Sequence, residues 1–169
     1  MVREKNAKIA SLALSAVIII ISIIHIDVNG VGIYAGAQWY KHLSYHFFHA
    51  SVLHALMNAW CLLCVVFRYD VSLWAIISAF VIASLYPADT LYSIFTQDSL
   101  TIPTIGLSGV CYALMGYIAF KVARKAYYHL WLAFYIVIGF LFPNVNGWVH
   151  LYCYVVGLLV GYLNKPIKC

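Results

Sequence analysis

The sequence predicts an all-α membrane protein with a bundle of six transmembrane helices. Of its 169 residues, 65% are hydrophobic and 9% are charged, whereas a soluble domain is about 25% charged. Too few polar side chains remain to cover a soluble globule, so most of the surface must face lipid. The apolar residues form continuous runs and do not alternate with polar ones. This pattern favours helices over a β-barrel, and a helix pairs every backbone group internally, as the bilayer requires.

Six apolar runs in the sequence are candidate membrane spans. Pro87 and Pro143 close the third and the fifth run. Several runs are close to the lower limit of about 17 residues for a span. We therefore expect a slightly thinned bilayer or strained helix ends. The runs cover residues 7–26, 45–67, 72–86, 107–122, 127–142 and 148–163.

The first run follows basic residues and is open to two interpretations, a secretory signal peptide or a retained membrane helix. Its apolar core is longer than the usual signal-peptide core of about 7–15 residues, which favours a retained helix. The sequence contains no linker, low-complexity segment or internal repeat. We therefore expect one domain over residues 1–169.

The distribution of charge predicts the orientation in the membrane. With six spans, nearly all Lys and Arg residues fall on one side, and Lys41 falls on the other with Asp27, Asp89 and Asp98. The positive-inside rule then places both termini in the cytoplasm, and we expect a multi-pass protein of the bacterial inner membrane. The net charge of +5 is explained by this cytoplasmic rim and implies no nucleic acid. The rim residues are Arg3, Lys5, Lys8, Arg68, Lys121, Arg124, Lys125, Lys165 and Lys168.

Polar residues inside the second, fourth and sixth runs predict one shared site. These three runs enter the membrane from the side opposite the basic rim. Ser108 and His150 lie within the first turn of their runs, and His54 and Asn58 lie two to four turns into theirs. All four should therefore lie in the outer half of the membrane. Polar groups there are costly and usually functional.

Spacing on the second run separates two groups of side chains. His54 and Asn58 lie about 40° apart on one helical face, so they could direct two N–H donors at one oxygen. His42, His46 and His49 form a different face. Those three could be a metal stripe or polar anchors at the membrane interface. We favour the anchors and expect no metal, because no acidic partner and no H-E-x-x-H motif lies nearby.

Small residues predict that the fourth and sixth runs touch. Gly109, Ala113 and Gly116 line one side of the fourth run, and Gly157 and Gly161 line one side of the sixth. Small residues four apart let two helix backbones approach closely in lipid. If these stripes face each other, the serine and the histidine that lie above them meet at one end.

Each polar residue also has a purely structural interpretation. A serine after glycine at a helix start is usually an N-cap, and a histidine in a span usually packs on a neighbouring carbonyl. A His/Asn pair at i, i+4 is often interhelical glue. The string around Ser108 is not the G-x-S-x-G nucleophile elbow, because Val110 takes the last position and no strand precedes it. The joint occurrence of these residues at matched depth nevertheless favours a shared site.

Three segments of the sequence together resemble the rhomboid family of intramembrane serine proteases. GLSGVCYALMG, at 106–116, is similar to the helix 4 motif of that family. HASVLHALMN, at 49–58, is similar to the helix 2 motif, and VHLYCYVVGLLVG, at 149–161, to the helix 6 motif. The order of the motifs, the six runs and the cytoplasmic termini also fit.

The resemblance implies an endopeptidase that hydrolyses a peptide bond in or near a substrate's transmembrane segment. Ser108 takes the position of the nucleophile and His150 that of the general base, and Tyr112 takes the position of a tyrosine that packs on this histidine. His54 and Asn58 take the oxyanion-binding positions, together with the backbone N–H of Ser108. The implied partners are single-span transmembrane proteins and the lipid bilayer.

No carboxylate occurs in the sixth run or near His150, so we expect a Ser–His dyad without a third member. Gly106 and Gly109 should let backbone and substrate come close. No metal and no organic cofactor is implied. The sequence departs from the family at Cys153, where a glycine is common, and in a short first loop, residues 27–44, with WYK at 39–41 in place of a Trp-Arg pair.

Two functions from other classes remain as alternatives. One is a catalytically inactive rhomboid relative that binds transmembrane clients, against which the intact Ser108 and His150 argue. The other is a small transporter or channel with a polar path. Against it, the polar residues gather in the outer half and do not continue to the inner face.

Overall fold

The computed structural model describes residues 2–24, 27–142 and 145–164. In these ranges all regular elements are helices, and a short antiparallel bridge joins Ile33 to Thr104. The all-α class is thus confirmed. The helices are α1 (Val2–Ile23), α2 (Val28–Val31), α3 (Lys41–Ser44), the 3-10 helix η1 (Tyr45–Phe47), α4 (Val52–Arg68), α5 (Leu73–Ser84), α6 (Ala88–Phe95), the 3-10 helix η2 (Asp98–Leu100), α7 (Ser108–Ile118), α8 (Lys125–Leu141) and α9 (Gly147–Leu163).

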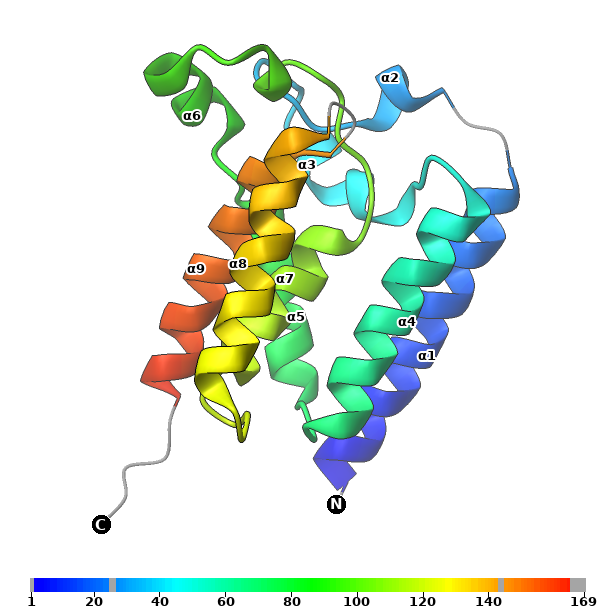
Figure 1. The fold of residues 1–169 in the computed structure, drawn as a ribbon. Coiled ribbons are helices and arrows are strands. Elements are labelled where there is room, and N and C mark those ends of the chain that lie inside the picture. Colours follow the sequence, from blue (N-terminus) through cyan, green and yellow to red (C-terminus); the bar gives the residue numbers. More distant parts are fainter. Residues whose placement is uncertain (1, 25–26, 143–144, 165–169) are drawn as a thin grey trace.

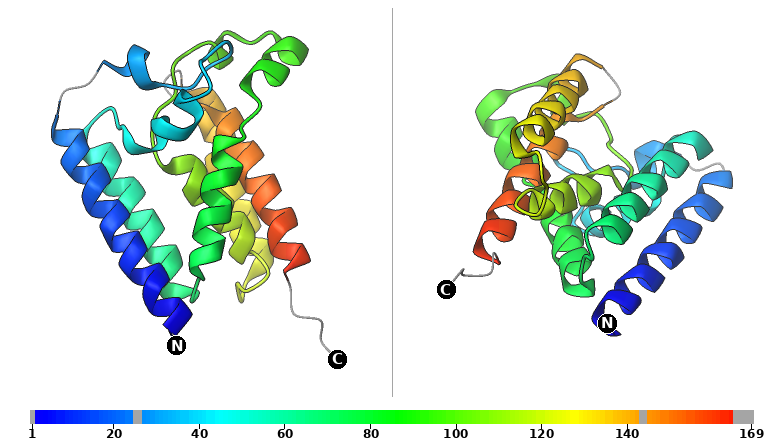
Figure 2. Two further views of the ribbon diagram at one scale, coloured as in Figure 1. Left: turned by 180° about the vertical axis from the view of Figure 1, so that it is seen from behind. Right: turned by 60° about the horizontal axis from the view of Figure 1, so that its bottom comes forward.

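Helix α7, which has 11 residues, lies in the middle of the bundle (Figures 1 and 2). It packs against α9, α5 and α4, while α1 lies along α4 and α8 lies beside α9. Helices α4, α7 and α9 all begin at the same end of the bundle, beneath α2, α3 and α6 (Figure 1). Side chains near the start of these three helices are therefore brought to one level.

The crossing of α7 and α9 depends on the small residues that the sequence predicts there. A Cβ atom added to Gly116 would lie 2.3 Å from the Tyr154 carbonyl oxygen, and one added to Gly157 would lie 2.1 Å from the Ala113 carbonyl oxygen. Neither distance leaves room for a side chain. The predicted contact between the two stripes is confirmed, and it brings the two backbones into direct contact.

The second apolar run does not form one helix from residue 45, as we expected. Helix α4 begins at Val52, where the Ser51 hydroxyl caps it by accepting the His54 N–H at 3.1 Å. The segment Lys41–Phe47 meets α4 at an angle of 95°. His54 therefore lies in the first turn of α4 and Asn58 in the second, closer to the helix start than the sequence predicts.

The three histidines of the predicted stripe consequently do not form one helical face: His42 and His46 both reach Ser84, whereas His49 lies outside the helices. His42 Nδ1 donates to the Ser84 carbonyl at 3.1 Å, and His46 Nε2 is hydrogen-bonded to the Ser84 hydroxyl at 3.0 Å. The Tyr45 hydroxyl donates to the Ala83 carbonyl at 3.0 Å. The last carbonyls of a helix have no partner within it. Side chains of α3 and η1 thus satisfy the end of α5, and this docking turns the chain before α4.

The number of membrane spans depends on how bent helices are treated. Among the described residues, one helix, over Lys5–Ile23, is long and apolar enough to cross a membrane. There are up to three spans if Lys41–Phe47 with Val52–Arg68, and Leu73–Ser84 with Ala88–Phe95, each form one bent span. Helices α7, α8 and α9 are apolar but have only 11, 17 and 17 residues. Six spans therefore stay a prediction.

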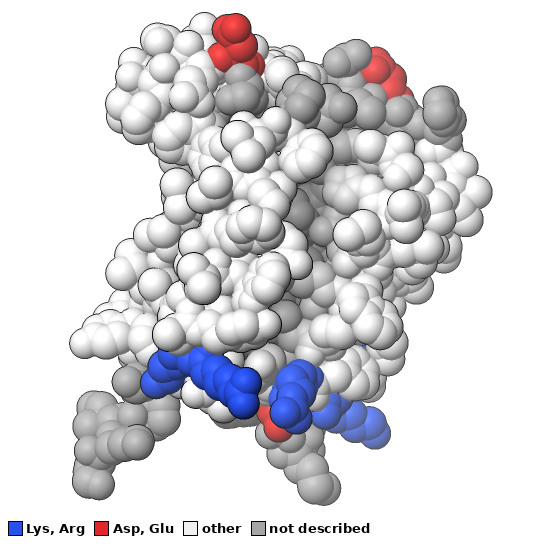
Figure 3. Space-filling model, viewed as in Figure 1, with Lys and Arg blue, Asp and Glu red and all other residues white. Residues whose placement is uncertain are grey.

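Charged side chains divide between the two ends of the bundle. Lys and Arg gather at the end where α4 finishes and α8 starts, and acidic side chains lie mainly at the opposite end (Figure 3). Asp70 is an acidic residue at the basic end, where it pairs with Lys8 at 3.5 Å. The faces between the two ends are almost free of charge in this view (Figure 3). This arrangement is that of an integral membrane protein.

Candidate active site

Ser108 is the first residue of α7, and its side chain contacts α9. Its Oγ lies 3.0 Å from His150 Nε2. The N-cap position is occupied by Leu107, which makes no side-chain capping bond. The N-cap interpretation of Ser108 is therefore wrong. The first turn of a helix leaves backbone N–H groups without an intrahelical partner, so the Ser108 amide is at a position suited to bind an oxygen.

The loop that leads into Ser108 is held in place from one side. Gly106 has a φ of +123°, a conformation that a side chain would strain. Its N–H donates to the Tyr45 carbonyl at 3.0 Å, and the Leu107 N–H donates to His49 Nε2 at 3.2 Å. His49, which the sequence suggested as an interfacial anchor, is thus a support for the residue before Ser108.

His150 lies in the first turn of α9 and is fixed from one face by Tyr112. The two rings stack with centroids 4.2 Å apart and an angle of 17° between their planes. Tyr112 lies one turn beyond Ser108 on α7, as the resemblance implied. His150 Nδ1 is buried and has no hydrogen-bond partner among the described residues. No acidic side chain of the described ranges therefore accepts a hydrogen bond from this nitrogen.

His54 and Asn58 converge on Gly106, and they differ in their access to the pocket. A Cβ atom added to Gly106 would lie 3.1 Å from His54 Nε2 and 3.4 Å from Asn58 Nδ2. His54 lines the pocket, whereas Asn58 is 6% exposed and is not among the lining residues. Asn58 Nδ2 is buried without a hydrogen-bond partner among the described groups. An unpaired buried N–H is costly, so this donor is free to meet an oxygen that enters beside Gly106.

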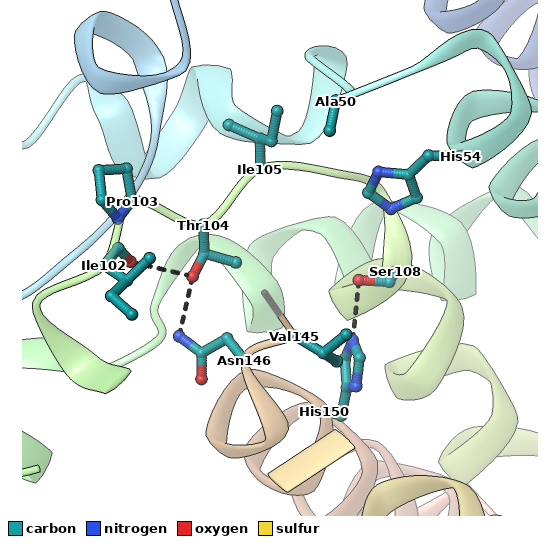
Figure 4. A pocket seen from close by; sticks show the side chains of 10 residues that line it. All are labelled: Ala50, His54, Ile102, Pro103, Thr104, Ile105, Ser108, Val145, Asn146 and His150. Atoms are coloured by element: carbon teal, nitrogen blue, oxygen red, sulfur yellow. Dashed lines mark hydrogen bonds between the residues drawn. The ribbon is translucent and has the colours of Figure 1, made fainter. Parts of the chain in front are cut away.

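Ser108, His150 and His54 line one pocket of about 490 Å³ (Figure 4). Ser108 and His150 point toward one another at one side of it, and His54 projects from α4 above Ser108 (Figure 4). The other side is formed by the segment before α7 and the start of α9. The lining residues are Ala50, His54, Ile102, Pro103, Thr104, Ile105, Ser108, Val145, Asn146 and His150.

Two polar residues of the pocket were missed by the sequence reasoning. Asn146 caps α9 by accepting the Val149 N–H on Oδ1 at 3.2 Å, and its Nδ2 donates to Thr104 Oγ1 at 2.9 Å. Thr104 in turn exchanges two backbone hydrogen bonds of 2.9 Å with Ile33. Asparagine directly before a glycine and an apolar run is a recognisable N-cap signal. Thr104 carries no comparable signal.

Gly109 and Cys153 lie together at the helix crossing, away from the pocket lining. A Cβ atom added to Gly109 would lie 3.2 Å from Val149 Cγ1, 3.3 Å from Ala83 Cβ and 3.3 Å from Cys153 Sγ. Gly109 therefore serves the approach of α5 and α9 to α7. Cys153 is fully buried and faces α7. In the part of the chain that the structure describes, no three His, Cys, Asp or Glu residues are grouped as a metal site would need.

A comparison with protein families gives one match that covers most of the chain. The model of the rhomboid domain matches residues 36–166. That range contains the three motifs on which the resemblance was based. A search of curated proteins found no match to the chain. With its apolar helices and its match over residues 36–166, the chain is an integral membrane protein that belongs to the rhomboid family.

Proposed function

We propose that this chain is an intramembrane serine endopeptidase whose catalytic dyad is Ser108 and His150. Rhomboid proteins are generally intramembrane serine proteases, which makes this class the first to test. The observation that carries the proposal is the 3.0 Å distance between Ser108 Oγ and His150 Nε2 at the side of a pocket. A hydroxyl beside an imidazole is the arrangement that activates a serine nucleophile.

The reaction requires two proton transfers by His150. Ser108 Oγ attacks the carbonyl carbon of the scissile bond while His150 Nε2 takes the hydroxyl proton. His150 then gives this proton to the leaving amine, and an acyl-enzyme remains. Water attacks the acyl group in the same way and releases the second product. Tyr112 keeps the imidazole plane fixed throughout, because the two rings are stacked.

The oxyanion of the tetrahedral intermediate is stabilised by three donors. These are the Ser108 backbone N–H, His54 and Asn58 Nδ2. The side chains of His54 and Asn58 converge on Gly106, two residues before the nucleophile. The unpaired state of Asn58 Nδ2 supports its role. A preorganised donor is worth most where charge develops, and its loss typically costs about 10²–10³ in rate.

The substrates are single-span transmembrane proteins, and the protein works as one domain over residues 1–169. Packing of α1 along α4 supports this extent. The membrane is a bacterial inner membrane. By the positive-inside rule, the basic end of the bundle and both termini face the cytoplasm. The pocket then opens to the outer face. Water reaches it there, which hydrolysis requires.

Two measurements on purified protein in detergent test the proposal. The first is cleavage of a generic single-span substrate, and the second is covalent labelling by a fluorophosphonate probe. Wild type should cleave and be labelled, and Ser108→Ala should do neither. Ser22→Ala is a matched control, since its hydroxyl bonds the Ile19 carbonyl on α1, a helix that contributes no residue to the pocket lining.

His150→Ala completes the test of the dyad. It should abolish cleavage while the protein elutes and melts like wild type. Cleavage by Ser108→Ala or His150→Ala at the wild-type rate would refute the dyad. A folded wild type that neither cleaves any single-span substrate nor reacts with the probe would refute the protease and favour a binder of transmembrane clients.

A further inference from the structure

A second cavity opens at the opposite end of the bundle from the candidate active site. It has a volume of about 760 Å³ and lies between α4 and α8, with α7 behind it (Figure 1). Its walls are almost entirely apolar, and Arg68 is the charged residue among those that line it. The lining residues are Trp60, Cys61, Cys64, Val65, Phe67, Arg68, Tyr69, Met115, Ile118 and Tyr128. We call this cavity the inner groove.

The inner groove has the length of one leaflet of a bilayer. From Trp60 to Arg68, α4 rises about 12 Å at 1.5 Å per residue. Half of a hydrocarbon core of about 30 Å is about 15 Å. Trp60 and Cys64 are exposed within this stretch, so the groove is open to the surrounding lipid. An apolar groove at this depth is filled by hydrocarbon, because water there would lack hydrogen-bond partners.

The headgroup end of the inner groove is positively charged. Arg68, the last residue of α4, is exposed and pairs with no acidic side chain in the described part of the chain. Lys121 stands beside it, since Lys121 Nζ donates to the Tyr69 carbonyl at 3.4 Å. The nearby carboxylate of Asp70 pairs with Lys8. Two cations thus flank the point where an acyl chain would leave the groove.

We propose that the inner groove is a binding site for an anionic phospholipid. One acyl chain lies along α4 between Trp60 and Phe67, and the phosphate lies against Arg68 with Lys121 beside it. A lipid with a net negative headgroup is preferred over a zwitterionic one, because Arg68 and Lys121 place positive charge at this end of the groove. Each basic side chain near an anionic headgroup is worth about a fivefold preference. This proposal does not depend on proteolytic activity.

Fluorescence quenching of Trp60 tests the proposal in vesicles. The chain carries five tryptophans, and changing the other four to Phe (Trp39, Trp74, Trp131 and Trp148) leaves Trp60 as the reporter. This variant is placed in phosphatidylcholine vesicles that contain a minor fraction of dibrominated phosphatidylglycerol or, separately, the same fraction of dibrominated phosphatidylcholine. The anionic lipid should quench Trp60 more strongly than the zwitterionic one.

Charge variants separate the proposed site from a general attraction to the basic rim. Arg68→Gln should lower the preference for the anionic lipid about fivefold, and adding Lys121→Gln should remove most of what is left. Arg124→Gln is the matched control. It removes the same charge from the same end of the bundle, but Arg124 lines a different cavity. It should leave the quenching ratio unchanged.

Native mass spectrometry of the otherwise unaltered chain repeats the comparison without the tryptophan changes. Wild type should retain phosphatidylglycerol in preference to phosphatidylcholine, and Arg68→Gln should not, whereas Arg124→Gln should behave as wild type. Equal quenching by the two brominated lipids, or equal loss of preference in Arg68→Gln and Arg124→Gln, would overturn the proposal. The groove would then take any lipid of the leaflet.

Discussion

Asn146 donates a hydrogen bond of 2.9 Å from its Nδ2 to Thr104 Oγ1, and each of these residues stands four positions before a member of the candidate dyad. Thr104 precedes Ser108 and Asn146 precedes His150. Asn146 also caps α9 by accepting the Val149 N–H. One buried side chain thus connects the segment that enters α7 to the start of α9.

We expect Asn146→Ala to lower kcat with little change in KM. The variant loses the link to Thr104 and the cap of α9, which together fix where His150 lies relative to Ser108. A displacement of about 1 Å costs about 100-fold in rate, and loss of a cap costs about 0.5–2 kcal/mol of stability. The measurements are cleavage kinetics and thermal unfolding in the same detergent.

Thr104→Val separates the two roles of Asn146. It removes the hydroxyl that Asn146 bonds and leaves the cap on α9 intact. We expect a smaller fall in kcat and a thermal midpoint close to that of wild type, since one hydrogen bond contributes about 1 kcal/mol. If Asn146→Ala has full activity, α9 places His150 without this link.

His54→Ala and Asn58→Ala should each lower kcat by about 10²–10³ and leave KM nearly unchanged. The reason is that the oxyanion exists only in the transition state and its intermediates, so a donor to it contributes nothing to ground-state binding. The wild-type and variant values of kcat and KM for one cleavable substrate decide this. A rise in KM at constant kcat would instead make the two residues substrate-binding or structural.

Tyr112→Phe should retain activity and Tyr112→Ala should lose most of it. The contact with His150 is made by the ring faces, at 4.2 Å between centroids, so the hydroxyl is dispensable for it. Removing the ring frees the imidazole to leave the Ser108 hydroxyl. Fluorophosphonate labelling rates give the readout, and equal labelling of wild type and Tyr112→Ala would show that the stacking is not needed.

Much of the bundle could be predicted, because helices that face lipid need long runs of apolar residues. The last four predicted runs agree with α5, α7, α8 and α9 to within a few residues. The contact between α7 and α9 could also be predicted from their small residues, since a close helix crossing in lipid needs Gly or Ala. The pairing of Ser108 with His150 follows from that crossing.

The start of α4 could not be predicted in this way. Residues 45–51 carry three aromatic residues and continue directly into the apolar run of α4. Hydrophobicity alone does not distinguish a membrane helix from a segment that turns back into the protein. What decides the break is tertiary: the Tyr45 hydroxyl and His42 bond the last carbonyls of α5, and Ser51 caps α4. The supporting roles of His49 and Thr104 were missed for the same reason, since both depend on contacts between distant segments.

Cys153 stands at a position where the family commonly has a glycine, and the space around it decides which substitutions it should tolerate. It is fully buried, one turn below His150, and its Sγ lies 3.3 Å from the position of a Cβ on Gly109. Cys153 therefore faces α7, as expected. Cys111, which lies on α7 one turn below Ser108, is directed elsewhere, because its Sγ donates to the Asn58 carbonyl at 3.6 Å.

Cys153→Leu should lower both stability and activity. At this crossing a methyl group on Gly109 would already lie only 3.3 Å from Cys153 Sγ, so a larger side chain at position 153 must push α9 from α7. Such overpacking costs about 1–3 kcal/mol. The same shift moves His150 away from Ser108. Cys153→Gly should keep activity, because it opens the crossing, at a helix-propensity cost of about 1 kcal/mol. Cleavage rates measured well below both thermal midpoints separate the catalytic effect from unfolding. A fully active Cys153→Leu would mean that α9 can move at this level without disturbing the Ser108–His150 distance, and that the α7–α9 crossing does not set the dyad geometry.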